Sequence, residues 1–296
     1  MIAMEITVHP FDTGLGAELR GLDLSRPLTR EAFDLWNKAF LDHHVVVLRG
    51  QAFDNRQHIA FSSWFGPIEE FPDPKEWAED DMPTVIRVSN VDRHTNAIKD
   101  VDEPGHKSFT LGTSDWHIDS SYKKVPSKCS LLFAREVPPR GGDTMFANLE
   151  AAYAELPEAK KREIDGLIIV HDFQYTRTRF GLPPRPPEIQ AKTPAVRHPL
   201  VHKVQGGKKS MLLGSHAATI EGMEPAAARR LLDELTEWST QPRFTYRHHW
   251  RVGDLVMWDN RTTMHRAMPY ELADDRRVLT RTTIIGEPLV ACQEVT

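Results

Sequence analysis

Cysteine is scarce in this chain, with two among 296 residues, Cys129 and Cys292. They are far apart and neither belongs to a CxxC pair, which disfavours a disulfide framework or a zinc site built from thiolates. A reducing compartment fits this cysteine usage. A basic surplus is also missing: 37 Lys and Arg against 42 Asp and Glu give a net charge of −5, which argues against nucleic acid as a partner.

Long apolar runs are missing as well, because no stretch approaches the roughly 20 residues that a membrane-spanning helix needs. Residues 1–10 show neither the basic start nor the apolar core of a signal peptide. We therefore expect a cytoplasmic protein without a membrane partner. Apolar residues make up 40% and charged residues 27%, an ordinary balance for a globular protein. No linker divides the chain, so a single domain over residues 1–296 is predicted.

Short apolar segments between turn residues predict many short strands and a few helices. Helix starts are expected at Thr29, Asp54, Asn148, Pro157 and Pro225. Strands are expected at 44–48, 84–88, 115–122, 130–137, 144–147, 166–173, 244–252, 255–258 and 277–285, with a hairpin over 201–214. Segments 69–113 and 174–198, rich in proline and charge, predict lid-like or surface loops. The pattern favours a mostly β jelly roll with flanking helices.

His117 and Asp119 lie two residues apart on the expected strand 115–122. Side chains alternate along a strand, so the imidazole and the carboxylate point the same way. One more imidazole completes a triad that holds non-haem Fe(II) on one face and leaves the other open. In a chain with 14 histidines the pair alone is weak evidence, and a half-buried strand explains it as well. His265, shortly after strand 255–258, is the candidate third ligand.

Arg277 and Arg281 are four residues apart on the last expected strand and share one face, about 13 Å apart at about 3.3 Å per residue. That face is otherwise mainly apolar, and a buried guanidinium needs an anion. A bound carboxylate suits it because arginine matches it in a bidentate way. A protein acid such as Asp143 or Asp274 is the open alternative, which applies above all to Arg276 on the opposite face.

These motifs occur in the order found in the taurine dioxygenase family of Fe(II)- and 2-oxoglutarate-dependent dioxygenases, which the chain resembles from about residue 12 to 287. The fold of that family is a double-stranded β-helix (jelly roll). The matching motifs are Trp116-His117-X-Asp119, Gly141-Gly142-Asp143-Thr144, Trp258-Asp259-Asn260-Arg261, His265 and the Arg277 and Arg281 pair. Each is weak alone, but together they are specific. Segments 116–122 and 246–261 look most like the 2,4-dichlorophenoxyacetate dioxygenase branch.

The resemblance implies that His117, Asp119 and His265 are the catalytic metal site and bind Fe(II). It further implies 2-oxoglutarate and O2 as co-substrates, with ascorbate as a supporting reductant. Such an enzyme hydroxylates a C–H bond of its substrate while 2-oxoglutarate becomes succinate and CO2. If the hydroxylated carbon carries an ether oxygen, the product falls apart and the ether is cleaved.

The resemblance also assigns the co-substrate's surroundings. Thr144 and Arg277 would hold the distal carboxylate of 2-oxoglutarate, with Trp258 beside it. Arg281 would lie near the metal-side carboxylate and near the anionic group of the primary substrate. Two departures from the family pattern stand out. Thr113 stands where relatives often have Asn, and the interval from His265 to Arg277 looks one residue longer, an increase that a loop over 269–275 can absorb.

The primary substrate is expected to be a small organic anion, in the first place an aryloxyalkanoate, with taurine or an alkyl sulfate as the alternative. Arg281 and His216 are the candidate substrate-binding residues, and the arginines of 174–198 add positive charge. Phe180 and Met211 are candidate apolar walls. A homo-oligomer is also expected.

Two other classes of protein compete with a dioxygenase. A zinc hydrolase can use the same triad, but it has no need of a keto-acid pocket with Thr144, Arg277 and Arg281. A non-catalytic jelly-roll binding protein would carry a vestigial triad, and the intact ligand set argues against it. Consumption of 2-oxoglutarate separates both classes from the oxygenase.

Overall fold

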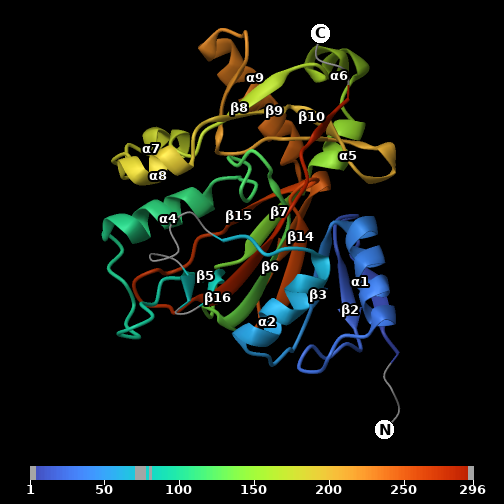
Figure 1. Ribbon diagram of the computed structural model, residues 1–296, viewed down its shortest axis with the longest axis vertical. Coiled ribbons are helices and arrows are strands. Elements are labelled where there is room, and N and C mark those ends of the chain that lie inside the picture. The colour runs from blue at the N-terminus through green and yellow to red at the C-terminus, as the bar shows by residue number, and fades with distance from the viewer. Residues whose placement is uncertain (1–4, 71–77, 80–81, 293–296) are drawn as a thin grey trace.

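The computed structural model describes residues 5–70, 78–79 and 82–292. One large sheet lies at its centre (Figure 1). This sheet has 8 strands in the order β1-β2-β3-β14-β6-β16-β5-β4, antiparallel except for the parallel pair β2 and β3. The strands are β1 Thr7–Pro10, β2 Ala17–Arg20, β3 Val45–Leu48, β4 Ala78–Glu79, β5 Met82–Ser89, β6 Ser127–Glu136, β14 Leu255–Asp259 and β16 Val278–Ile285.

Three smaller sheets have the orders β13-β7-β15, β12-β8-β9 and β11-β10-β17. Their strands are β7 Thr144–Asn148, β8 Ile168–His171, β9 Val196–Pro199, β10 Val201–Lys203, β11 Lys209–Met211, β12 Ala217–Ile220, β13 Thr245–His248, β15 Thr263–Ala267 and β17 Val290–Ala291. Phe146 of β7 and Tyr246 of β13 pack on the inner face of the large sheet, against Val256 and Trp258. Two facing sheets with this core confirm the predicted jelly roll.

Helices cover the sheets on several sides. They are α1 Arg30–His43, α2 Asn55–Ser62, α4 Pro104–Ser114, α5 Leu149–Ala154, α6 Glu158–Ile164, α7 Tyr175–Arg179, α8 Pro187–Lys192 and α9 Pro225–Ser239, with 3-10 turns η1 Ser63–Phe65, η2 Gln205–Gly207 and η3 Pro242–Phe244. Trp36 and Phe40 of α1 are fully buried against the large sheet. Helices α4, α7 and α8 lie together at another side (Figure 1). Among the described residues, no helix combines the length and apolarity needed to cross a membrane.

The helix starts expected from capping residues are confirmed. The Thr29 hydroxyl accepts the amide of Ala32, and Asn148 caps α5 in the same way. Asp54 and Gln57 form a complete capping box at the start of α2. Each side chain satisfies a backbone N–H that has no partner inside its helix.

The loops expected over 69–113 and 174–198 are wrong in part, because the structure has helix α4 in the first and helices α7 and α8 in the second. Residues 71–77 and 80–81 of the first loop lie outside the described residues. The prolines that argued against regular structure begin helices here: Pro104 and Pro187 occupy the first turns of α4 and α8. A first-turn proline costs nothing, since its missing N–H has no acceptor there.

The strand expected over 115–122 is also wrong. His117 alone pairs, through an isolated bridge to His265, and the chain then turns. Ser120 in that turn has a positive φ of 54°. His265 lies on β15, a strand that its sequence did not predict. The expected strands 244–252 and 255–258 correspond to β13 and β14, which belong to different sheets.

Candidate active site

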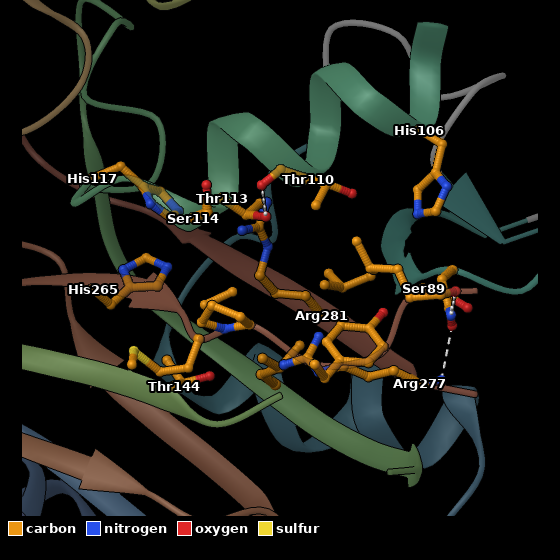
Figure 2. A pocket seen from close by; sticks show the side chains of 18 of the residues that line it. Ser89, His106, Thr110, Thr113, Ser114, His117, Thr144, His265, Arg277 and Arg281 are labelled. Carbon is orange, nitrogen blue, oxygen red and sulfur yellow. Dashed lines mark hydrogen bonds between the residues drawn. The ribbon is translucent and has the colours of Figure 1, made fainter. Parts of the chain in front are cut away.

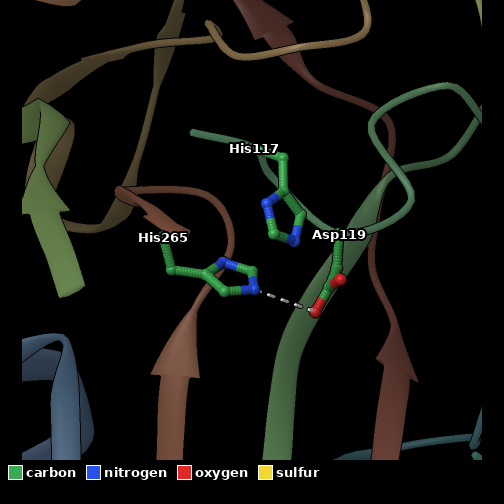
Figure 3. A group of neighbouring side chains, drawn as sticks. All are labelled: His117, Asp119 and His265. Carbon is green, nitrogen blue, oxygen red and sulfur yellow. Dashed lines mark ion pairs between the residues drawn. The ribbon is translucent and has the colours of Figure 1, made fainter. Parts of the chain in front are cut away.

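His117, Asp119 and His265 converge on one point, as Figure 3 shows. One possible ligand atom from each lies within 4.8 Å of the other two, and all three residues are buried. The bridge between the two histidine backbones brings their rings together: His117 N–H donates to His265 O and His265 N–H to His117 O, both at 2.9 Å. The ring centroids are 4.1 Å apart. The short bridge and the following turn thus replace the predicted strand and still bring the carboxylate to the two imidazoles.

Each of the three groups is in the form that a metal ligand requires. Burial lowers the pKa of both imidazoles, well below the usual value for His265, so both rings are neutral at neutral pH. Burial alone would raise the pKa of Asp119, but the Arg281 guanidinium above all, with the hydrogen bond from Ser130, outweighs it, and the value is about 2. The Nδ1 atom of His117 lies 2.9 Å from the carbonyl oxygen of Asp115. If that nitrogen carries the proton, the Nε2 lone pair is left for a metal.

A chain of hydrogen bonds orients the carboxylate of Asp119. The Ser130 hydroxyl donates to its Oδ2 at 2.6 Å. Asn260 Nδ2 donates to the Ser130 oxygen at 3.0 Å, and Trp258 Nε1 donates to Asn260 Oδ1 at 3.0 Å. The Trp258 ring in turn packs on His265, with centroids 4.6 Å apart. The expected site residue Trp258 therefore supports two members of the triad.

A cavity of about 200 Å³ begins at the two histidines and ends at Arg277 (Figure 2). Its lining includes the expected residues Thr144, Trp258 and Arg281. Helix α4 contributes part of its wall, where the sequence predicted a lid-like loop and not a helix. That wall includes His106, Thr110, Thr113 and Ser114.

Arg277 and Thr144 present donors at the far end of this cavity. Arg277 is 5% exposed, and its Nε donates to the carbonyl of Gly142 at 3.0 Å. Burial lowers its pKa to about 10, which leaves it charged at neutral pH. The Thr144 hydroxyl accepts a hydrogen bond from Trp250 Nε1 at 3.0 Å. The proton of the Thr144 hydroxyl is therefore free to be donated to another acceptor, such as a carboxylate.

The expected turn at Gly141 and Gly142 is confirmed and shapes the Arg277 end of the cavity. Both glycines have positive φ, 74° and 67°. A Cβ on Gly142 would lie 2.7 Å from Pro138 Cγ and 3.2 Å from Arg277 Nε. The diglycine therefore gives Arg277 the room to donate to the backbone of the turn.

Arg281 has an acid partner within the protein, contrary to the expectation that a bound anion would supply it. Its Nη1 lies 2.5 Å from Oδ1 of Asp119. The alternative acid Asp143 instead pairs with Arg247 and His249. Arg276 pairs with Glu136 at 2.6 Å, as anticipated for the opposite face.

A second cavity, of about 110 Å³, lies next to the triad, with His117 and Asp119 in its lining. The two cavities share Thr113, His117 and Arg281 in their linings. Aromatic and apolar side chains form part of its wall, together with charged groups from α7 and the segment after it. The lining includes Ile118, Tyr122, Phe173, Leu182, Arg177 and Arg185.

His216 lines this second cavity, as expected, but not as a cation. Burial lowers its pKa to about 3, so the imidazole is neutral at neutral pH. Its Nδ1 lies 3.1 Å from the Thr176 hydroxyl, and its ring meets that of Tyr122 edge-on with centroids 5.0 Å apart. His216 therefore offers a polar edge within an aromatic wall.

Several substrate contacts expected from the sequence are elsewhere in the structure. Met211 is fully buried in a core cluster, and Phe180 is absent from both cavity linings. Arg197 pairs with Glu221 on the surface. Phe173 and Tyr122 take the place of the expected walls, stacked with ring centroids 4.1 Å apart. The sequence placed both residues at the ends of expected strands, 115–122 and 166–173, whereas the structure has them in turns, so the pattern gave no sign of a cavity wall.

A family model matches residues 7–283 of the chain, with the description taurine catabolism dioxygenase TauD, TfdA family. The chain belongs to this family. The alpha-ketoglutarate-dependent 2,4-dichlorophenoxyacetate dioxygenase of Burkholderia sp. (strain RASC) is 39% identical over 250 residues, 82% of each chain. The alkylsulfatase of Acinetobacter baylyi is 32% identical over 92% of this chain and 83% of its own.

A solved structure, AAD-2 in complex with Mn(II) and N-oxalylglycine, has the same fold. It matches this TauD, TfdA family chain with a TM-score of 0.87 and 35% identity, over 98% of this chain and 100% of its own. These similarities confirm the expected dioxygenase family and the jelly roll. Members of this family depend on Fe(II) and 2-oxoglutarate.

Proposed function

We propose that this protein is an Fe(II)- and 2-oxoglutarate-dependent dioxygenase that cleaves the ether bond of aryloxyalkanoates. The observation that carries this proposal is the meeting of two cavities at the triad, one ending at a charged arginine and the other walled by aromatic rings. The first suits a linear dicarboxylate that reaches from metal to arginine. The second suits an aromatic anion.

His117, Asp119 and His265 fit Fe(II) as ligands. Two neutral imidazoles and one carboxylate form the donor set of facial-triad iron enzymes. Each Asp119 oxygen accepts one hydrogen bond from a side chain, from Arg281 or Ser130, and a carboxylate oxygen has a second lone pair for a cation. Iron bound there with 2-oxoglutarate supplies the oxidant that hydroxylates a nearby C–H bond.

Arg277 and Thr144 would bind the distal carboxylate of 2-oxoglutarate. Among the described residues Arg277 forms no ion pair with an acid, so its charge is left for a ligand. A guanidinium donates two parallel hydrogen bonds to a carboxylate, and the Thr144 hydroxyl adds a third donor. The match to AAD-2 supports this assignment, because N-oxalylglycine has two carboxylates, like 2-oxoglutarate.

The second cavity would hold the aryloxyalkanoate. Arg281 lies at its junction with the triad, where Nη1 pairs with Asp119. A guanidinium has five N–H donors, and those not used by Asp119 would draw the substrate carboxylate toward the metal side. The stacked pair Tyr122 and Phe173 offers apolar surface for the aryl ring, and Arg185 lies over Phe173 with Cζ 4.2 Å from the ring centroid. Aromatic rings favour such offset or edge contacts.

Hydroxylation of the carbon between the ether oxygen and the carboxylate gives a hemiacetal. The bond between the hydroxylated carbon and the ether oxygen breaks, and the hydroxyl proton passes to the phenolate, so phenoxyacetate yields phenol and glyoxylate. One O2 and one 2-oxoglutarate are consumed, with succinate and CO2 as the other products. The enzyme's contribution is to hold that carbon next to the metal and to exclude water.

The substrate can be identified by comparing phenoxyacetate, an alkyl sulfate and taurine under the same conditions. The purified protein is incubated with Fe(II), ascorbate, 2-oxoglutarate and each compound, and phenol, sulfate or sulfite is quantified. We expect phenol from phenoxyacetate well above the other products. Sulfite from taurine, or sulfate from the alkyl sulfate, without phenol would overturn the substrate assignment.

An alkyl sulfate is the second candidate, favoured by the similarity to the Acinetobacter baylyi alkylsulfatase. A sulfate group can pair with Arg281 as a carboxylate does. The aromatic wall of Phe173 and Tyr122 favours the aryl substrate, since an alkyl chain gains nothing from edge or stacking geometry.

A further inference from the structure

The Arg277 guanidinium forms no ion pair with an acid among the described residues, and its Cζ lies over the Tyr270 ring, 5.9 Å from the centroid. Its Nε donates to the carbonyl of Gly142 at 3.0 Å. The adjacent carboxylate, Asp143, is bonded to Arg247 at 2.7 Å and to His249 at 2.9 Å. With no acid of the described chain to hold the guanidinium, its position depends on the carbonyl of Gly142, on the Tyr270 ring and on where the backbone at residue 277 lies.

Asn90 fixes that backbone. It follows β5 directly and is 1% exposed. Its Oδ1 accepts the Arg277 N–H at 2.8 Å, while its Nδ2 donates to Leu272 O at 2.9 Å and to Asp275 O at 2.7 Å. The Asn90 N–H also donates to Arg277 O at 3.3 Å. A single buried side chain thus closes the segment 272–277 into a loop and ties its end to β5.

The chemistry of this contact suits asparagine. A carboxamide has one oxygen that accepts and two N–H groups that donate, all on a short side chain. In Asn90 the oxygen and both N–H groups are hydrogen-bonded. Aspartate at this position keeps the acceptor but sets a carboxylate oxygen against two carbonyl oxygens. Alanine leaves the Arg277 N–H and both carbonyls without this partner.

We propose that Asn90 is the positioning residue for Arg277 and thereby sets the preference of the enzyme for 2-oxo acids that carry a second carboxylate. The inference rests on the proposed function, because it takes 2-oxoglutarate as the ligand of Arg277. A shift of the segment 272–277 moves the guanidinium away from the distal carboxylate. A 2-oxo acid without that carboxylate makes no use of Arg277, so its affinity is indifferent to the shift.

Equilibrium binding tests this directly. The full-length protein loaded with Mn(II) is titrated in a calorimeter with 2-oxoglutarate and with 2-oxobutanoate, which lacks the distal carboxylate. In Asn90→Ala and Asn90→Asp the affinity for 2-oxoglutarate is expected to fall about tenfold or more, which corresponds to one or two lost hydrogen bonds. The affinity for 2-oxobutanoate stays at the wild-type value. In turnover, KM for 2-oxoglutarate rises and kcat at saturation changes little.

Arg276→Ala is the matched control. Arg276 is the neighbour in the same segment, but its guanidinium points outward, to Glu136 and to Asn96. The variant loses these outward contacts but keeps all the Asn90 contacts, which still hold the segment 272–277 in place. Both affinities are therefore expected to stay unchanged. Arg277→Ala shows how much 2-oxoglutarate affinity is lost when the guanidinium is removed altogether. Adding Asn90→Ala to it should lower that affinity no further, because Asn90 acts only through Arg277.

Wild-type affinity for both acids in both Asn90 variants would overturn the inference. Equal losses for both acids would overturn it too, because they indicate general damage. If Asn90→Ala fails to fold, the nearly isosteric Asn90→Asp decides alone. Normal 2-oxoglutarate binding by Arg277→Ala would instead refute the co-substrate site of the proposed function.

Discussion

His117, Asp119 and His265 line a cavity and do not belong to the apolar core. We predict that replacing any one of them with Ala abolishes Fe(II)-dependent turnover and Mn(II) binding, since two remaining ligands do not complete the site. The fold should persist, as measured by circular dichroism. His9→Ala, at an exposed position on β1, is the control and should bind metal like the wild type. Full metal binding by a triad variant would remove that residue from the site.

Arg277 is predicted to contribute most of the discrimination for a second carboxylate. Arg277→Ala should weaken 2-oxoglutarate binding by about 3–5 kcal/mol, the cost of removing one partner of a buried charge pair. Arg277→Lys should recover part of this, because an ammonium replaces the two-pronged guanidinium. KM for 2-oxoglutarate at saturating primary substrate measures both effects. A Lys variant indistinguishable from the wild type would show that bidentate contact is unnecessary.

The diglycine turn before β7 allows a matched test of backbone geometry. Gly142→Ala combines a positive φ with a clash at Pro138, next to Arg277. Gly222→Ala has a similar φ of 72° and nothing within 4 Å of the added Cβ. Both variants should lose about 1 kcal/mol or more of unfolding free energy from the strained φ. Only Gly142→Ala should also raise KM for 2-oxoglutarate, and equal KM values in the two would contradict the account of the turn.

The starts of several helices were predictable from the sequence because a capping residue next to the helix determines them. Thr29, Asp54 and Asn148 cap their helices as expected, because the cap needs only the residues of one turn. Helices α4 and α7 were missed because prolines and charges resemble a loop, and their stability comes from contacts with distant segments. One such contact is the ion pair between Arg179 of α7 and Asp115, at 2.9 Å.

The site was predictable to the extent that motifs carry it. The triad, Thr144, Trp258, Arg277 and Arg281 all line the two cavities. The partner of Arg281, and the supporting roles of Ser130 and Asn90, depend on strands brought together from distant parts of the chain. No local pattern in the sequence indicates which side chain faces which across a sheet.

Buried neutral histidines are predicted to make the whole fold sensitive to acid. Burial lowers the pKa of His58 to about 3 and that of His202 to about 4. Between about pH 6.5, where a histidine of the unfolded chain titrates, and these values, the unfolded state binds protons that the folded state does not. The contribution of these histidines to the free energy of unfolding is therefore fully present above that range. It falls as the pH drops, by up to about 1.4 kcal/mol per pH unit for each such group.

Urea unfolding at a series of pH values measures this dependence. His58→Gln removes one titrating group from the interior, so the slope of unfolding free energy between pH 4 and 6 should decrease by about 1.4 kcal/mol per pH unit. His9→Gln makes the same exchange at an exposed position and should keep the wild-type slope. A His58 variant with an unchanged slope would show that His58 is protonated in the folded protein.

The jelly roll places two cavities next to the triad His117, Asp119 and His265. Under the proposed function, co-substrate and substrate would approach the triad separately through them. Helix α4 lines both cavities, and α7 lies against it at the second. The predicted homo-oligomer and the predicted cytoplasmic location stay predictions.

The stoichiometry of a single reaction tests the proposed function most directly. The protein is incubated with Fe(II), limiting phenoxyacetate and excess 2-oxoglutarate, and phenol and succinate are quantified in the same sample. Equal amounts of both are expected, with neither formed when 2-oxoglutarate or Fe(II) is omitted or when His265→Ala replaces the wild type. Phenol released without 2-oxoglutarate would indicate a hydrolase, and succinate formed without phenol would show that phenoxyacetate is not the substrate.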